Sequence, residues 1–128
     1  MKLLLDTHAF LWWVEDNPAL SRRARRAIAD PRNDVLFSAV SAWEVTMKVR
    51  AGKLRLPEAP ATYIPSAVQR NGFATLALGL EHSLEVGALP GIHWDPFDRL
   101  LIAQARAESA RLVSNDDTVR KYPVDIYW

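Results

Sequence analysis

The sequence predicts an α/β fold with a central parallel sheet of about four to five strands and helices on both faces. A length of 128 residues suits one domain. Apolar residues make up 49% of the chain and charged residues 24%, a balance that allows a globular core. Short apolar runs alternate with helical patterns along the chain, which is typical of a parallel sheet covered on both faces. We therefore expect residues 1–128 to form a single domain.

Capping residues and apolar runs define the expected elements of the first half. Ser21 is a favoured N-cap, and Pro31 stops the helix that Ser21 begins. Either Ser38 or Ser41 can cap the next helix, which Gly52 ends. The expected elements are a strand over residues 2–6, a short helix over 9–15, a helix over 21–30, a strand over 34–38 and a helix that reaches residue 51.

Proline and glycine divide the second half into shorter elements. Pro57 and Pro60 bracket a loop, and Asn71-Gly72 ends the helix that follows the loop. Asp95 precedes a proline, a pair that suits the start of a longer helix. The expected elements are a helix over residues 64–70, a strand over 73–78, a helix over 80–88, a helix from 95 to about 109, a strand over 112–114 and a short strand over 124–127.

Composition excludes several kinds of site. The chain has no cysteine, so disulfides and thiolate zinc sites are excluded. Its three histidines share no i, i+4 spacing that would place two zinc ligands on one helix. The first apolar run, residues 3–5, is too short for a signal-peptide core or a membrane span. We therefore expect a cytoplasmic protein without a membrane partner. A net charge of +1 is not typical of a general nucleic-acid binder.

Two acidic positions directly follow expected strands. Asp6 comes after the apolar run of residues 3–5, and Asp116 and Asp117 come shortly after the strand over 112–114. Sites in parallel sheets form outside the carboxyl ends of the strands, so these acids are candidates for function. The structural alternatives are an N-cap for Asp6 and a turn or cap for the later pair. Periodicity does not choose between Asp116 and Asp117.

Two further acids lie on expected helices. Asp98 shares a helical face with Leu101 and Ile102, so it points toward the packed side, where a charge needs a partner. Its structural alternative is a favourable interaction with the helix dipole in the first turn. Glu44 lies at the edge of an apolar stripe, and its structural alternative is an i, i+4 pair with Lys48.

Together these acids predict a divalent metal site. Four carboxylates from four separate elements would repel one another unless a cation occupied the space between them. Oxygen ligands suit Mg²⁺ or Mn²⁺. One or two such ions can activate water for the hydrolysis of a phosphodiester.

Four segments resemble the acidic motifs of PIN-domain ribonucleases, in the order and approximate spacing of the VapC-type toxins. They are residues 5–8 (LDTH), 41–44 (SAWE), 95–105 (DPFDRLLIAQA) and 112–116 (LVSND). The third segment is the most specific, and the resemblance extends over nearly the whole chain. It implies helices around a parallel sheet, an Mg²⁺- or Mn²⁺-dependent endoribonuclease, a homodimer, and neutralisation by a VapB-like antitoxin.

The resemblance also assigns roles to residues. The positions that match its metal-binding and catalytic acids are Asp6, Glu44, Asp98 and Asp116. The supporting positions are the hydroxyl residues Thr7 and Ser114, together with Asp117, which leaves the last acid ambiguous. The alternative function is a catalytically silent PIN-like module that binds RNA or a protein partner. A module without chemistry has no need to place four acids together.

A basic cluster and two adjacent tryptophans suggest partners. Arg22, Arg25 and Arg26 share a helical face near the start of their helix, where the dipole disfavours cations. A solvated face is the default, and RNA phosphates or an acidic partner segment are the functional alternative. Trp12 and Trp13 cannot share one inward face, so one of them is expected to meet a partner. The RNA target does not follow from the sequence.

Overall fold

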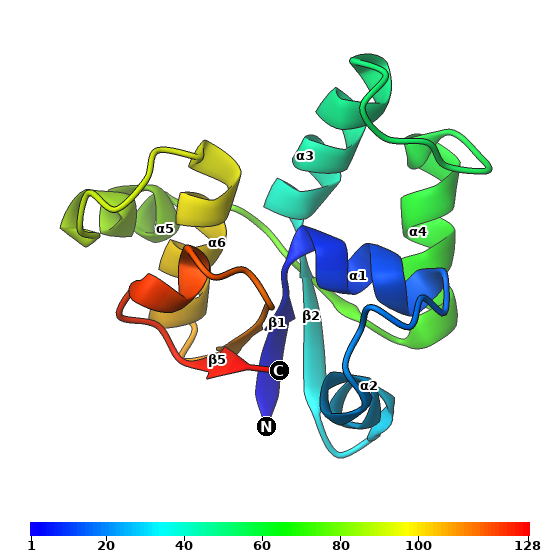
Figure 1. Ribbon diagram of the computed structural model, residues 1–128, viewed down its shortest axis with the longest axis horizontal. Coiled ribbons are helices and arrows are strands. Elements are labelled where there is room, and N and C mark those ends of the chain that lie inside the picture. Colours follow the sequence, from blue (N-terminus) through cyan, green and yellow to red (C-terminus); the bar gives the residue numbers. More distant parts are fainter.

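A five-stranded parallel sheet forms the centre of the protein, which we describe from a computed structural model of residues 1–128 (Figure 1). The strand order is β3-β2-β1-β4-β5, and every neighbouring pair is parallel. The strands are β1 (Lys2–Leu5), β2 (Asp34–Ser38), β3 (Ala74–Leu76), β4 (Arg111–Val113) and β5 (Ile126–Tyr127). The predicted parallel sheet is therefore confirmed.

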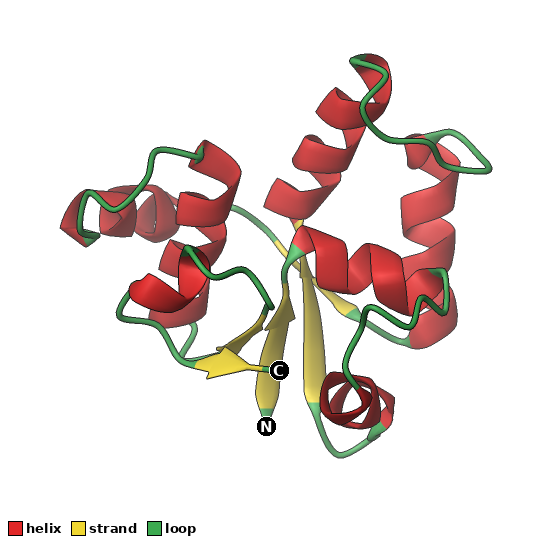
Figure 2. Cartoon of the chain, in the orientation of Figure 1, coloured by secondary structure: helices red, strands yellow, loops and turns green.

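Six α-helices and two 3₁₀ turns connect the strands (Figure 2). They are α1 (Thr7–Val14), α2 (Arg22–Ala29), α3 (Ala39–Arg50), α4 (Pro60–Asn71), α5 (Leu80–Glu85), η1 (Val86–Ala88), α6 (Pro96–Ala107) and η2 (Val119–Lys121). The Ser21 hydroxyl caps α2 by accepting from the Ala24 N–H, and the Ser38 hydroxyl caps α3 by accepting from Val40. Ser38, and not Ser41, is thus the N-cap of α3. None of these helices has the length and the apolar content to cross a membrane.

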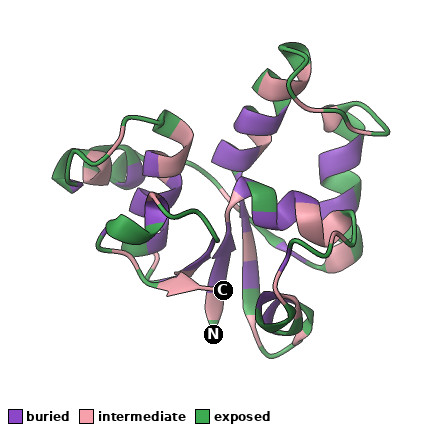
Figure 3. Cartoon of the chain, in the orientation of Figure 1, coloured by how far each residue is buried: buried purple, intermediate pink, exposed green.

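The two faces of the sheet carry separate apolar clusters. In β1, Leu3 and Leu5 belong to the larger cluster, which packs against α1, α2 and α4. Leu4 points to the opposite face and joins the cluster that contains Leu101 and Ile102 of α6. Figure 1 shows these two groups of helices on opposite sides of the sheet, and Figure 3 shows buried residues along β1 and the helix faces next to it. Helices on both faces are therefore confirmed.

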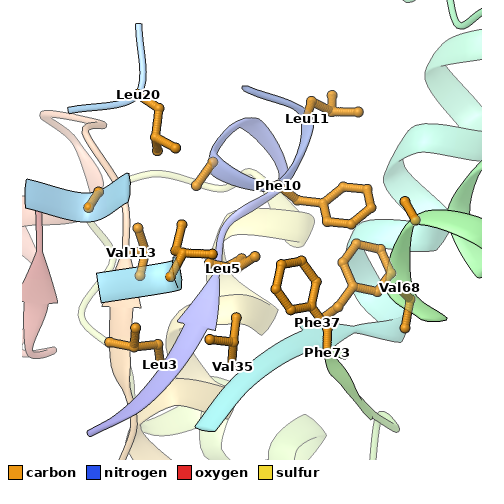
Figure 4. Packing of buried hydrophobic residues seen from close by; sticks show 14 of the residues in the cluster. Leu3, Leu5, Phe10, Leu11, Leu20, Val35, Phe37, Val68, Phe73 and Val113 are labelled. Carbon is orange, nitrogen blue, oxygen red and sulfur yellow. The ribbon is translucent and has the colours of Figure 1, made fainter. Parts of the chain in front are cut away.

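Phenylalanine rings fill the centre of the larger cluster (Figure 4). The ring of Phe10 lies 4.3 Å from that of Phe37 and 6.4 Å from that of Phe73, measured between centroids. Phe10 belongs to α1, Phe37 to β2, and Phe73 directly precedes β3. Such aromatic pairs stabilise beyond the area that they bury, so they hold α1 firmly over the sheet.

Several expected boundaries were wrong. Helix α4 begins at Pro60, where we expected a loop, because proline suits the first helical position and its missing N–H costs nothing there. Pro65 lies within this helix, a position that usually argues against a continuous helix. The expected helix over residues 80–88 ends as an α-helix at Glu85 and continues as a 3₁₀ turn. The strand expected over residues 73–78 pairs only over three residues.

Strand register places polar residues at one edge of the sheet. Leu5 lies opposite Phe37 in β2 and opposite Val113 in β4. The residues that follow these three are Asp6, Ser38 and Ser114, so all of them emerge at the carboxyl edge. Here the strand order departs from the order along the chain, which is where open parallel sheets form their crevices.

Candidate active site

A pocket of about 360 Å³ opens at the carboxyl edge of the sheet. Its lining is strongly polar and consists of Asp6, Thr7, His8, Trp12, Glu44, Lys48, Asp95, Asp98, Asn115 and Asp116. The four acids that the sequence singled out therefore lie around one cavity, although they come from four segments. Their role as metal ligands remains a prediction.

Asp6 joins the end of β1 to the start of α1. Its Oδ1 accepts a hydrogen bond from the Ala9 N–H at 2.7 Å and caps the helix, as the structural alternative required. Its own N–H donates to the Val113 carbonyl at 3.1 Å, which holds the residue against β4. Burial raises the pKa of Asp6 to about 6, and the negative charge of Asp98 raises it further, whereas the Ser114 side chain and the Ala9 N–H oppose the rise. Asp6 can therefore cap α1 and line the pocket at the same time.

Glu44 reaches the pocket from the second turn of α3 and is only 4% exposed. The Thr7 hydroxyl donates to Glu44 Oε1 at 2.6 Å, and the Lys48 ammonium group pairs with Oε2. The Oγ1 of Thr7 also lies 3.0 Å from the Ser41 hydroxyl. The pair with Glu44 raises the pKa of Lys48, so Lys48 stays charged at neutral pH. Glu44 therefore makes the expected i, i+4 pair and also lines the pocket.

Asp98 lies in the first turn of α6. The helix is capped by its neighbour Asp95, whose Oδ1 accepts from the Asp98 N–H at 3.0 Å. Oδ2 of Asp98 lies 3.0 Å from Nε2 of His93. Burial raises the pKa of Asp98, the charges of Asp95 and Asp116 raise it further, and His93 opposes the rise. Since Asp95 supplies the cap, the side chain of Asp98 is free to serve the pocket.

Asp116 and Asp117 are both exposed, but only Asp116 lines the pocket. The Oδ1 of Asp116 accepts from the N–H groups of Thr118 at 2.8 Å and Val119 at 3.0 Å, where η2 begins. The Ser114 hydroxyl accepts from the Asp116 N–H at 3.2 Å. These bonds decide which member of the acidic pair faces the other three acids.

Two residues outside the lining of the pocket, His93 and Arg99, were not singled out from the sequence. His93 was set aside because its spacing did not suit zinc, yet it contacts Asp98. Arg99 was not singled out, yet it is buried with 7% exposure. The apolar residues Ile102 and Ala103, three and four positions after Arg99, were a usable sign of its burial. No local pattern pointed to His93.

The sequence model of the family described as PIN domain matches residues 3–124 of the chain. The chain belongs to the PIN domain family. Ribonuclease VapC22 of Mycobacterium tuberculosis is 28% identical over 126 residues, which cover 94% of this chain and 91% of that protein. Ribonuclease VapC16 of the same organism is 41% identical over 59 residues, which cover 46% of this chain and 42% of that protein. The predicted resemblance is confirmed.

Solved structures show the same fold. VapBC2 from Rickettsia felis, bound to a DNA fragment from its promoter, superposes with a TM-score of 0.73 at 20% identity. DNA-bound VapBC from Salmonella typhimurium gives 0.71 at 17% identity. Each match covers 98% of this chain and 96% of the other chain. At these identities the likeness concerns the fold of the PIN domain.

The donor set of this PIN domain fits a hard divalent cation. The pocket offers mainly carboxylate oxygens, together with the imidazole of His8 and no sulfur, and Lys48 is the neighbouring cation. The raised pKa values of Asp6 and Asp98 express chiefly the energetic cost of burying a negative charge and, to a smaller extent, the repulsion by neighbouring acids. A bound cation would relieve this cost, and Mg²⁺ or Mn²⁺ prefers such oxygen ligands. The four acids would hold it.

A second cluster of possible metal ligands lies elsewhere in the PIN domain. Ligand atoms of Glu81, His82 and Glu108 lie within 4.8 Å of one another. Nδ1 of His82 accepts a hydrogen bond from the Gly79 N–H at 2.9 Å, so the ring proton is on Nε2, which donates to Glu108 at 3.1 Å. No ring nitrogen is left for a metal, so this cluster joins α5 to α6 and is structural.

Proposed function

We propose that this protein is an Mg²⁺- or Mn²⁺-dependent endoribonuclease and acts as the toxin of a VapBC-type toxin–antitoxin pair. The observation that carries the proposal is the convergence of Asp6, Glu44, Asp98 and Asp116 on one polar pocket. The names of the two VapC relatives support ribonuclease activity. An RNA substrate would place the activity in the cytoplasm.

The residues around the pocket have separate tasks in this proposal. A divalent ion held by the four acids would polarise the phosphodiester and lower the pKa of water. Thr7 orients Glu44, and Ser114 restrains the backbone next to Asp116. The side chain of Lys48 is 37% exposed and charged, so it suits contact with an RNA phosphate. Asp117 contributes only negative charge near the rim, and Asp117→Asn should reduce cleavage less than Asp116→Asn.

The proposed antitoxin is a VapB-like protein, and the solved VapBC complexes support this choice of partner. Two members of the basic cluster remain available to it or to RNA, because Arg22 and Arg26 are exposed. Arg25 pairs with Asp16 at 2.8 Å and donates to the Asn17 carbonyl. None of the three arginines lines the acidic pocket.

Exposed apolar residues support a homodimer. Trp43 and Met47 of α3 are 49% and 51% exposed, and Leu80 and Leu84 of α5 are 75% and 68% exposed. Burial of such side chains in an interface stabilises association. Trp12 and Trp13, by contrast, pack partly against the larger core cluster of the same chain. The proposed dimer therefore uses α3 and α5 more than the tryptophan pair.

The direct test is cleavage of defined RNAs by the purified protein, with Mg²⁺ or Mn²⁺ and with EDTA. We expect cleavage products only with the metal. Binding of RNA in a gel-shift assay without any cleavage under either condition would refute the nuclease and favour the silent binding module. Co-expression with the neighbouring gene, followed by purification of the complex, tests the antitoxin.

A further inference from the structure

Arg99 of α6 is buried without a carboxylate partner. Its NH1 donates to the carbonyls of Pro90 at 2.9 Å and His93 at 3.2 Å, and to the Tyr122 hydroxyl at 3.0 Å. Its NH2 donates to the Val86 carbonyl at 3.4 Å. Burial of a cation without a counter-ion costs free energy. We therefore expect the hydrogen bonds of the Arg99 guanidinium to have a role that a neutral side chain would not fill. These bonds hold the segment before α6 and reach a tyrosine from the far end of the chain.

The hydroxyl of Tyr122 makes its hydrogen bonds to Arg99 and His93. Its oxygen accepts hydrogen bonds from Arg99 NH1 at 3.0 Å and from the backbone N–H of His93 at 3.1 Å. A hydroxyl oxygen has two lone pairs, and these two donors occupy both. The hydroxyl proton of Tyr122 is therefore donated to one of two acceptors on His93. Nδ1 of His93 lies at 2.6 Å, closer than the His93 carbonyl at 3.1 Å.

This arrangement favours one tautomer of His93. Because Nδ1 accepts from Tyr122, the proton of the neutral ring is on Nε2, which donates to Asp98 Oδ2 at 3.0 Å. A proton on Nδ1 would point at an oxygen whose lone pairs are already used. Arg99, Tyr122, His93 and Asp98 thus form a hydrogen-bond chain. Each donor in it points the same way, from the guanidinium of Arg99 to the carboxylate of Asp98.

We propose that Arg99, Tyr122 and His93 are positioning residues that fix the carboxylate of Asp98 for the metal. His93 holds one carboxylate oxygen, and the other, Oδ1, makes no hydrogen bond and is left for the ion. The inference rests on the proposed function, because it assumes that Asp98 is a ligand. Groups that orient a ligand in this way commonly change metal affinity or activity by about 10- to 100-fold.

The same hydrogen-bond chain connects two of the four acids, Asp98 and Asp116. Tyr122 is the C-cap residue of η2, and Asp116 accepts hydrogen bonds from the backbone N–H groups of Thr118 and Val119 at the other end of this short helix. A shift of Tyr122 therefore moves η2 and disturbs Asp116 as well as His93. The hydrogen bonds of Tyr122 to His93 join the loop before α6 to the C-terminal segment, so Tyr122 couples Asp98 to Asp116.

The test compares variants that keep or remove the donor to Asp98. His93→Gln retains an amide N–H near the position of Nε2, whereas His93→Leu removes the donor and keeps the bulk. We expect His93→Leu to weaken Mn²⁺ binding, measured by calorimetry, by about 10- to 100-fold and to lower kcat with little change in KM. His93→Gln should recover most of both losses. Tyr122→Phe should also weaken Mn²⁺ binding, while its matched control Tyr127→Phe should not.

A second measurement needs no metal and no activity. Two-dimensional ¹H–¹⁵N spectra of the imidazole rings in the metal-free protein report the tautomer of each histidine. We expect a proton on Nε2 of His93 in the wild type and a mixture of tautomers in Tyr122→Phe. A proton on Nδ1 in the wild type would overturn the inference, even where His93→Leu fails to fold.

Asp98→Asn separates the inference from the function on which it rests. If Asp98→Asn keeps Mn²⁺ affinity and RNA cleavage, the proposed metal site is wrong. If Asp98→Asn loses both while His93→Leu and Tyr122→Phe match the wild type, the metal site stands and the positioning role is refuted.

Discussion

The hydroxyl of Thr7 donates to Oε1 of Glu44 across 2.6 Å and joins the first turn of α1 to α3. Both side chains are buried, with 5% and 4% exposure. The bond satisfies a carboxylate that water cannot readily reach, and it turns Glu44 toward the pocket. Removing one partner of a buried, charge-assisted bond leaves the other unsatisfied, which makes this contact a sensitive point of the fold.

Thr7→Val keeps the shape of the side chain and removes the donor. We expect a loss of about 1–3 kcal/mol in the free energy of unfolding, measured by urea denaturation in EDTA. Thr46→Val is the matched control, because Thr46 is exposed on the same helix as Glu44 and bonds only to the Ala42 carbonyl. The control should change stability by less than about 0.5 kcal/mol. Equal losses in both variants would contradict the role of Thr7.

Asp98→Asn and Asp95→Asn distinguish a ligand from a cap. Asp98→Asn should reduce RNA cleavage by about 100-fold or more, beyond the range of changes to residues that only orient a ligand. Asp95→Asn should cost little, because asparagine caps a helix about as well as aspartate. Initial rates at saturating Mn²⁺ provide the comparison. Full activity of both variants would make Asp98 a helix-dipole residue and remove it from the site.

Divalent metal should stabilise the folded protein. At a free Mn²⁺ concentration 100 times the dissociation constant, binding to the folded state alone adds about 2.7 kcal/mol. Thermal unfolding in millimolar Mn²⁺ and in EDTA should therefore give different midpoints in the wild type. Glu44→Gln should reduce the difference, because it removes a ligand charge. An unchanged wild-type midpoint would count against a preformed site.

Asp6 should make the metal-free protein less stable as pH rises. Its pKa is about 6 in the folded state and 3.8 as the ordinary value, so the folded state holds the proton more tightly. The stabilisation by this proton is complete below pH 4 and is lost as pH rises through 6. Asp6→Asn lacks this loss and should be more stable than the wild type above pH 6, by at most about 3 kcal/mol for a shift of roughly two pH units. Urea unfolding in EDTA at pH 4, 5, 6 and 7 tests this. Parallel stability curves for the two proteins would contradict it.

The exposed face of α3 should carry the dimer. Light scattering at micromolar concentration should report about twice 14.4 kDa for the wild type. Met47→Asp places a charge among exposed apolar side chains and should shift the mass toward the monomer. Thr62→Asp, on the exposed side of α4, is the control and should leave the mass unchanged. A monomer at all concentrations in the wild type would refute the dimer.

Local sequence patterns alone are enough to place Asp6 and Asp98. An acid that follows a buried strand reaches the carboxyl edge of a parallel sheet, whatever the rest of the chain does. An acid that shares a helical face with Leu101 and Ile102 points toward the packed side. These inferences depend on the periods of strand and helix, which are properties of neighbouring residues. The prediction of where α4 begins was wrong because the local pattern is ambiguous there. Pro60 permits both a loop and a first helical turn.

Only the tertiary structure decides which of Asp116 and Asp117 lines the pocket. It also forms the hydrogen-bond chain from Arg99 to Asp98. The choice between the two acids depends on which carboxylate accepts from the N–H groups that begin η2, a matter of a few ångströms. Tyr122 lies 29 residues from His93, and their contact forms because β4 pairs with β1 and brings η2 beside α6. Hydrogen-bond partners at such separations are set by the packing of whole elements, and no sequence period carries that information.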